Sequence, residues 1–528
     1  MSLKRSIFII LLFVVHAKTV THDIPDNNNF ESTFFNTLEE NDLYNKNIIF
    51  DNYRTTPTEL IKDLSNKNSF NNLSIVDDEA LNTESPLYKH IHTVRTAQHT
   101  IMRTQPRPWT IVIYMAADND LRGFAARNIK QMATIGSNEF INILVQLDIR
   151  IGGTTGNKKI TRRYFIEKNK IVHVNSEDST SQQMDSGDPE TLISCCAWAT
   201  ENYPSDYFGL VFWNHGTGII DPTSGRITSS SELFTFNPSS HKFDLDRSTG
   251  FLDFINLKFK ENEQRGICWD DSSGNYLTNQ KLDHALEVIK TRHLNNRKID
   301  LIGFDACLMS MLEVGNIVKK YATIMVGSQE VELGTGWNYE RALSQFNSGA
   351  PLPTQLAQNI VTAYEGSYNK ITNDYTQSAL DLSGITALEE NVHVVSRLLL
   401  EGLKLQRNNT VRNTVKMSCN KLLCTNFDEP SYKDLHHFYS NMLINLKHMT
   451  FIDEAQGSKL KRLLEEKLNQ GRQLINKIVI ANVSGKNLSQ AKGISIYLPE
   501  RKIHSSYRKT TFAESNDWVN FLNQYLLA

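Results

Sequence analysis

Apolar runs of strand length alternate along the chain with segments whose apolar positions recur at helical spacing. The strand-like runs lie at residues 110–115, 141–148, 207–214 and 299–304, and helical spacing lies between them at 122–135, 189–202 and 279–290. Runs that are apolar throughout indicate strands buried on both faces of a sheet. The alternation therefore predicts an α/β fold with a mainly parallel sheet flanked by helices.

Two of these strands lead into residues that carry chemistry. The run at 299–304 continues into a turn with Asp305 and Cys307, and the run at 207–214 continues into His215. We expect a helix from residue 308, so that its dipole favours the Cys307 thiolate. An imidazole at the end of a neighbouring strand can accept the thiol proton. The structural alternatives are a buried thiol at Cys307 and a strand-capping histidine at 215.

Eight segments, in this order, resemble the clostripain family of cysteine peptidases, which share the caspase-like fold. They are WTIVIYMAADNDL (109–121), DPETL (188–192), FWNHGTG (212–218), GICWDDSSGNYLT (266–278), IDLIGFDACLMSMLEV (299–314), GSQEVELGTGWNY (327–339), SALDLS (378–383) and AKGISIYLP (491–499). The resemblance covers the chain from about residue 108 to its end. It implies a caspase-like fold and a cysteine endopeptidase that hydrolyses peptide bonds after Arg, less after Lys. Cys307 and His215 would act as a dyad through an acyl-enzyme.

The same resemblance implies further roles around this pair. The backbone amides of Gly216 and Cys307 are expected to form an oxyanion hole. An acidic pocket would receive the basic substrate side chain. Trp337 could line the cleft because it lies in a glycine-rich loop. The substrate-binding candidates are Asp305, Glu330, Glu332 and Trp337. The alternatives are an N-cap role for Asp305 and a core role for Trp337.

Two other functions fit the same residues. A catalytically inactive exported binding protein could use the same scaffold, although intact Cys307 and His215 argue against it. A transpeptidase would form the same acyl-enzyme and pass it to an amine instead of water.

Composition narrows the classes of partner. The chain has 528 residues, 40% of them hydrophobic and 22% charged, with a net charge of -2. This balance gives no electrostatic case for nucleic acid or an anionic membrane. We expect a monomer that acts on protein or peptide substrates. The six cysteines are sparse for an exported protein; Cys419 and Cys424 could bridge locally, whereas the adjacent Cys195 and Cys196 are expected to be buried.

The N-terminal region predicts export. Lys4 and Arg5 precede an apolar run at 7–15, so residues 1–17 are expected to be a signal peptide, and the run is too short for a stable membrane anchor. This indicates a secreted or periplasmic protein. Residues 18–105 are asparagine-rich and predict a pro-segment or linker, with a small polar domain as the alternative. Residues 106–383 would form the catalytic domain, and 384–528 a mostly helical C-terminal subdomain.

A long polar insert, residues 219–264, separates the histidine and cysteine segments. Relatives are cut between these segments, so the resemblance implies a self-processing precursor; a plain surface insertion is the alternative. Basic residues in or beside the insert are Arg226, Lys242, Arg247, Lys258, Lys260 and Arg265. No cofactor is expected to be required. Asp270 with Asp271, and the turn at 118–120, offer oxygen ligands for calcium, but a solvated turn is the favoured interpretation of the aspartate pair.

Overall fold

The structure is a computed structural model that describes residues 74–75, 106–153, 156–174, 183–220, 233–247 and 266–527. The chain divides into two compact units, residues 1–55 and 56–528, and every described residue belongs to the second. The expected signal peptide lies outside the described residues. So does the expected pro-segment or linker, apart from the short strand β1 (Ser74–Ile75).

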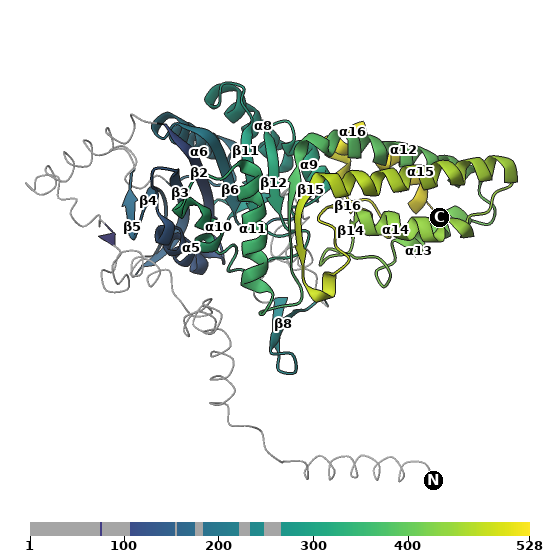
Figure 1. The fold of residues 1–528 in the computed structure, drawn as a ribbon, viewed down its shortest axis with the longest axis horizontal. Helices are drawn as coiled ribbons and strands as arrows, with labels where there is room; N and C mark the ends of the chain where they lie inside the picture. The colour runs from purple at the N-terminus through teal and green to yellow at the C-terminus, as the bar shows by residue number, and fades with distance from the viewer. Residues whose placement is uncertain are drawn as a thin grey trace, which may run out of the picture. The chain divides into compact units, whose positions relative to one another are not determined.

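A ten-stranded sheet forms the centre of the second unit (Figure 1). Its strands, in spatial order, are β1, β5 (Lys170–His173), β4 (Gly156–Glu167), β3 (Ile141–Gly153), β2 (Arg107–Ala117), β6 (Ser205–Trp213), β11 (Ile299–Asp305), β12 (Ala322–Gly327), β13 (Thr376–Asp381) and β15 (Val479–Ser484). The five central strands, from β3 to β12, run parallel, and antiparallel strands flank them on both sides. Residues on both faces of β2, such as Val112 and Ile113, are fully buried. The predicted mainly parallel, doubly covered sheet is confirmed.

Helices cover both faces of this sheet (Figure 1). One face carries α5 (Arg122–Ile135), α10 (Tyr339–Ala342) and α11 (Pro353–Tyr368); the other carries α6 (Pro189–Asn202), α8 (Asn279–Val288) and α9 (Leu312–Val318). A π-helical turn, Ile289–His293, extends α8. The start of α6 follows from its sequence, because Asp188 accepts a hydrogen bond from Glu190 N and Pro189 occupies the first helical position.

The C-terminal part is mostly helical, as predicted. Its helices are α12 (Ile385–Leu405), α13 (Thr410–Ser418), α14 (Leu435–Asn445), α15 (Glu454–Ile478), α16 (Thr511–Ser515) and α17 (Trp518–Leu526). Helix α12 packs against α15 and α17, and α14 packs against α15. Two short strands, β14 (Tyr432–Asp434) and β16 (Ser495–Tyr497), pair antiparallel. Because β15 joins the central sheet beside β13, this part shares one sheet and one hydrophobic core with the rest of the unit.

Two further hairpins lie outside the central sheet. Strands β9 (Ile267–Asp270) and β10 (Asn275–Leu277) form one of them. Strands β7 (Phe234–Asn237) and β8 (Lys242–Leu245) form the other, inside the polar insert. The remainder of the insert, residues 221–232 and 248–264, lies outside the described residues. Short 3₁₀ helices occupy Ser344–Asn347, Leu382–Gly384, Leu446–His448, Lys486–Leu488 and Tyr507–Lys509.

The cysteines are all free and buried. The spacing of Cys419 and Cys424 allows a local bridge, but both thiols are free. The buried apolar environment expected for Cys195 and Cys196 is confirmed. In the described part of the chain, no helix combines the length and the apolar character needed to cross a membrane.

Candidate active site

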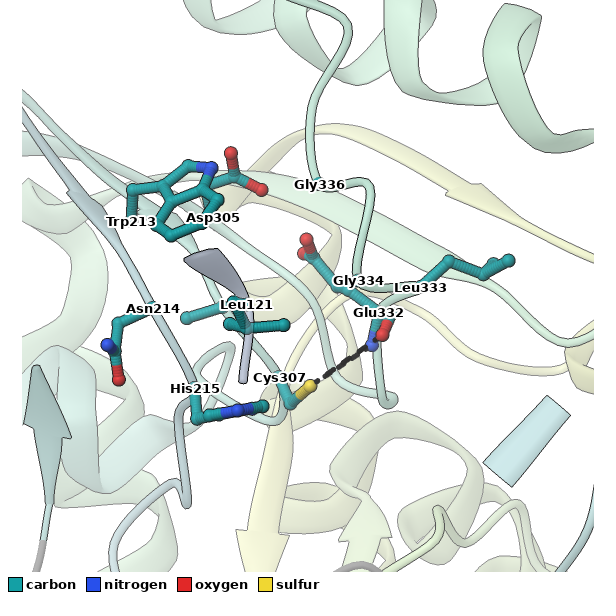
Figure 2. Close-up of a pocket in the computed structure, with 11 residues that line it drawn as sticks. Leu121, Trp213, Asn214, His215, Asp305, Cys307, Glu332, Leu333, Gly334 and Gly336 are labelled. Carbon is teal, nitrogen blue, oxygen red and sulfur yellow. Dashed lines mark hydrogen bonds between the residues drawn. The ribbon is translucent and has the colours of Figure 1, made fainter. Parts of the chain in front are cut away.

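The candidate thiol and imidazole lie at matching positions on adjacent strands. Strands β6 and β11 run parallel, and their last paired residues are Trp213 and Asp305. His215 and Cys307 each follow two residues later, so the register of the sheet brings both to the same edge. They line one small pocket of about 20 Å³, and Figure 2 shows the imidazole directed toward the sulfur.

The helix expected at the thiol begins later than predicted. Helix α9 starts at Leu312, and Leu308 adopts a left-handed conformation with φ of 63°, so Cys307 lies on a loop. The helix dipole therefore does not act on this thiol, and that expectation is wrong. Instead, Cys307 Sγ accepts a hydrogen bond of 3.3 Å from the Glu332 backbone N–H. Burial raises the pKa of the Cys307 thiol well above its ordinary value, and nearby carboxylates add to this rise.

His215 is held by contacts that the sequence did not reveal. Its Nε2 lies 2.8 Å from Oδ1 of Asp120, in the turn that follows β2. The preceding residue, Asn214, anchors the backbone by donating to Ala116 O and accepting from Trp269 N. Sequence reasoning treated Asp120 only as part of an acidic turn. The available signal was its position at the carboxyl end of a strand, but only the pairing of β2 with β6 places that end beside His215.

Gly216 brings the histidine segment against the cysteine loop. A Cβ built on Gly216 would lie 2.5 Å from the carbonyl oxygen of Cys307 and 2.9 Å from Sδ of Met309. A side chain at this position would therefore push the two backbones apart. The two segments can approach this closely because residue 216 is a glycine.

Two buried carboxyl groups share the pocket with the thiol. Asp305 accepts hydrogen bonds from Trp337 N (2.9 Å) and Tyr339 OH (2.8 Å), so it does not cap α9, whose N-cap is Met311. Burial raises the pKa of Asp305 to about 7. Glu332 is also buried, and its carboxyl group interacts with the carboxyl group of Asp305 and with the side chains of Gln377 and Trp337. Burial raises the pKa of Glu332 well above its ordinary value, and the Asp305 charge adds to this.

The other two substrate-binding candidates do not line this pocket. Glu330 is fully buried and its Oε2 lies 2.6 Å from Nη2 of Arg247. Trp337 is buried beneath the sheet edge, where a Cβ on Gly303 would lie 2.7 Å from its ring. Trp337 contributes to the pocket through its backbone N–H, which holds Asp305 in place.

Two of the aspartates considered for calcium, Asp118 and Asp270, lie beside Lys159 together with Asp148. The Lys159 ammonium pairs with Asp270 and lies 3.2 Å from Asp148 and 3.9 Å from Asp118. Asp270 is buried, so its interpretation as part of a solvated turn is wrong. Within the described ranges no group of three or more His, Cys, Asp or Glu side chains is arranged to hold a metal ion. The ammonium supplies the positive charge that these carboxylates need.

Adjacent parallel strands of a mainly parallel, helix-flanked sheet bring a thiol and an imidazole into one pocket. This arrangement is that of caspase-like cysteine peptidases. A model of the clostripain family matches residues 113–236 and 256–525. The chain therefore belongs to the clostripain family.

Individual relatives are more distant. Clostripain from Hathewaya histolytica is 27% identical over 261 residues, which are 46% of this chain and 42% of that protein, so the match spans less than half of the relative. A secreted C11 cysteine protease from Bacteroides thetaiotaomicron, solved with an irreversible peptide inhibitor, shares the fold at 18% identity with a TM-score of 0.50, over 78% of this chain and 99% of that one. A second structure of a secreted C11 cysteine protease from that organism, called iotapain, has 15% identity and a TM-score of 0.50, over 78% of this chain and 100% of that one.

Proposed function

We propose that this protein is a cysteine endopeptidase that hydrolyses peptide bonds after basic residues. The observation that carries the proposal is the shared pocket, in which Cys307, His215 and the carboxyl groups of Asp305 and Glu332 meet at one sheet edge. A thiol with an adjacent imidazole supports nucleophilic attack, and buried acidic groups beside it support binding of a cationic substrate side chain.

In this mechanism Cys307 is the nucleophile and His215 the proton carrier. Nδ1 of His215 accepts the thiol proton, since Nε2 faces Asp120, and the sulfur attacks the scissile carbonyl carbon. The amides of Gly216 and Cys307 stabilise the negative oxygen of the tetrahedral intermediate. Its collapse breaks the C–N bond, and the amine leaves with the proton from His215. Water, deprotonated by His215, then hydrolyses the thioester and restores the thiol.

Asp120 has a supporting role in this proposal. Its carboxylate orients the imidazole and stabilises the positive charge that His215 carries after it accepts the thiol proton. The pair becomes a triad of Cys307, His215 and Asp120, in place of the dyad expected from the sequence.

The acidic pair, Asp305 and Glu332, supports a preference for a basic residue in this proposal. Glu332 is a buried carboxyl group that interacts with the buried carboxyl group of Asp305, and a guanidinium offers a planar set of donors that would pair with both. The positive charge would also relieve the repulsion between Glu332 and Asp305, which raises the pKa of the Glu332 carboxyl. Arginine therefore suits this pocket better than lysine, whose ammonium is a more compact charge.

The described state has features of a precursor. A pocket of about 20 Å³ holds roughly one water molecule, far less than an arginine side chain. The buried neutral thiol is a poor nucleophile. We infer that the chain is made as a precursor and that self-cutting in the insert at 219–264 activates it. From the N-terminal sequence we also infer that the protein is secreted.

We expect turnover to be independent of added metal, because Lys159 already lies among Asp118, Asp148 and Asp270. Excess EDTA should leave the rate unchanged, and a loss that calcium restores would contradict this expectation.

Fluorogenic peptides that end in Arg, Lys or Ala before the scissile bond test the proposal. Wild-type protein should cleave the Arg peptide fastest and the Ala peptide slowest. Cys307→Ala should abolish turnover, while the control Cys195→Ala, at a buried cysteine in α6, should not. Equal turnover by Cys307→Ala and wild type would refute the proposal. Product masses show whether the acyl group passes to water, as proposed, or to an amine.

A further inference from the structure

Residues 233–247 of the polar insert, which we call the insert hairpin, pack onto the main body. Phe243 N donates to Ile371 O at 2.8 Å. Lys242 Nζ donates to Asn369 O at 2.7 Å and to Asn373 Oδ1 at 2.8 Å. The hairpin is thus an ordered, hydrogen-bonded part of the fold, although the insert around it is polar in sequence.

Arg247, the last described residue of the hairpin, is paired with buried acids. Its Nη2 lies 2.6 Å from Oε2 of Glu330 and 3.4 Å from Oδ1 of Asp374. Both carboxylates are buried, and the charge of Asp428, also buried, acts on the same guanidinium. Burial by itself would lower the pKa of Arg247, but these carboxylates raise it above its ordinary value. Buried carboxylates that lose their cation are strongly destabilised, so this group depends on Arg247.

Glu330 connects this ion pair to the thiol. Its backbone oxygen accepts a hydrogen bond of 3.2 Å from the N–H of Leu308, the residue after Cys307. Its Oε1 accepts from Val331 N at 2.8 Å. The next residue, Glu332, donates its N–H to Cys307 Sγ. Glu330 therefore fixes the backbone that follows the thiol and the backbone that hydrogen-bonds to it.

We propose that Arg247 is a positioning residue for Cys307, acting through Glu330. Arg247 neutralises the buried Glu330 carboxylate, and this holds Glu330 where it can bind Leu308 and place the Glu332 N–H on the sulfur. The consequence for catalysis rests on the proposed function; the consequence for the geometry of the thiol does not. The insert hairpin is then a permanent part of the active protein, and Arg247 is not a processing site.

The test compares four variants of the full-length protein. Arg247→Ala removes the cation, and Arg247→Lys keeps the charge without the planar set of donors. Lys242→Ala loosens the same hairpin without touching Glu330, and is the matched control. The double variant Arg247→Ala with Glu330→Gln removes both charges. The readouts are the rate of Cys307 alkylation by iodoacetamide across pH, located by peptide mass, and kcat and KM on a peptide with Arg before the scissile bond.

We expect Arg247→Ala to slow Cys307 alkylation and to lower kcat about tenfold, with a smaller change in KM. The reason is that the substitution displaces the thiol but leaves the residues of the substrate pocket in place. The charges of Glu332, Asp428 and Glu330 raise the pKa of the Cys307 thiol, and loss of the Arg247 charge should strengthen this effect and shift the alkylation profile to higher pH. Arg247→Lys and the double variant should recover most of the loss, and Lys242→Ala should stay within about twofold of wild type.

The proposal would be overturned if Cys307 in Arg247→Ala were alkylated at the wild-type rate, or if Lys242→Ala slowed the alkylation as much as Arg247→Ala does. Should Arg247→Ala fail to fold, the double variant decides, since it leaves no unpaired charge at Glu330: recovered alkylation supports the proposal and slow alkylation refutes it. If wild type that has been cut in the insert cleaves no peptide, the proposed function fails, whereas the alkylation rates still decide the role of Arg247.

Discussion

Replacing Asp120 by asparagine removes a negative charge from His215 while preserving the shape of the side chain. In the structure, Asp120 Oδ1 lies 2.8 Å from His215 Nε2, and the exposed fractions of the two side chains are 28% and 1%. The imidazole is therefore buried beside a carboxylate that is partly in contact with water. In the proposed mechanism the charge of Asp120 matters most in the transition state, when His215 would hold the thiol proton.

The size of the effect follows from this geometry. A hydrogen bond to a charged group contributes about 1.5–3 kcal/mol. Water screens part of the Asp120 charge, so we reduce this to about 1–2 kcal/mol. If the transition state loses this stabilisation and the free enzyme does not, kcat/KM falls by about 5- to 30-fold.

The assay measures kcat/KM on a peptide with arginine before the scissile bond. The matched control is Asp271→Asn, at a carboxylate in the adjoining turn whose side chain is 24% exposed and pairs with Arg150. The control should remain within about twofold of wild type, as surface substitutions usually do. Unchanged kcat/KM in Asp120→Asn, or an equal loss in Asp271→Asn, would refute the role of Asp120.

Three further predictions follow from the same structure. Because the pKa of Asp305 is raised to about 7, its carboxyl is uncharged at lower pH, and KM for an arginine peptide should fall as pH rises through this value. A KM that does not change with pH would contradict this. Replacement of the second acidic group, Glu332→Gln, should raise KM about tenfold. Burial raises the pKa of Glu313 to about 7, so its contribution to stability is present below the unfolded pKa and is lost as pH rises toward 7. Glu313→Gln should therefore stabilise the protein by about 2 kcal/mol at pH near 8 and change its stability little at pH near 4. Equal shifts of the thermal unfolding temperature at the two pH values would contradict this prediction. N-terminal sequencing of fragments from active material should find no cut after Lys242 or Arg247, because both side chains are held by the main body, and a major cut at either would count against the retained hairpin.

The acidic residues near the thiol show where sequence reasoning stopped. Glu330 and Glu332 are equivalent in the sequence, two positions apart on one loop. In the structure only Glu332 lines the pocket, whereas Glu330 faces Arg247 from a distant segment. The distinction depends on where the insert hairpin packs, and no local pattern encodes that.

The loop after Cys307 shows a similar limit. The apolar residues from 308 onward have helical spacing, yet α9 begins only at Leu312. Leu308 N instead donates to Glu330 O, and Ser310 N donates to Ser328 O at 2.8 Å, so neighbouring segments take the backbone bonds that a helix would have used. Apolar periodicity over a few residues reports burial, and burial in a loop looks the same as burial in a helix.

By itself, the sequence determined the order of the main strands and helices and the position of Cys307 and His215 just after the ends of two buried strands. Buried parallel strands are continuous apolar runs, and the residues that follow them gather at one edge of the sheet. Only the tertiary structure decided that Asp120 reaches His215, that Lys159 lies among the aspartates and that Arg247 holds Glu330. Each of these contacts joins side chains from segments far apart in the chain, and their partners are set by strand order and packing, which local residue patterns do not specify.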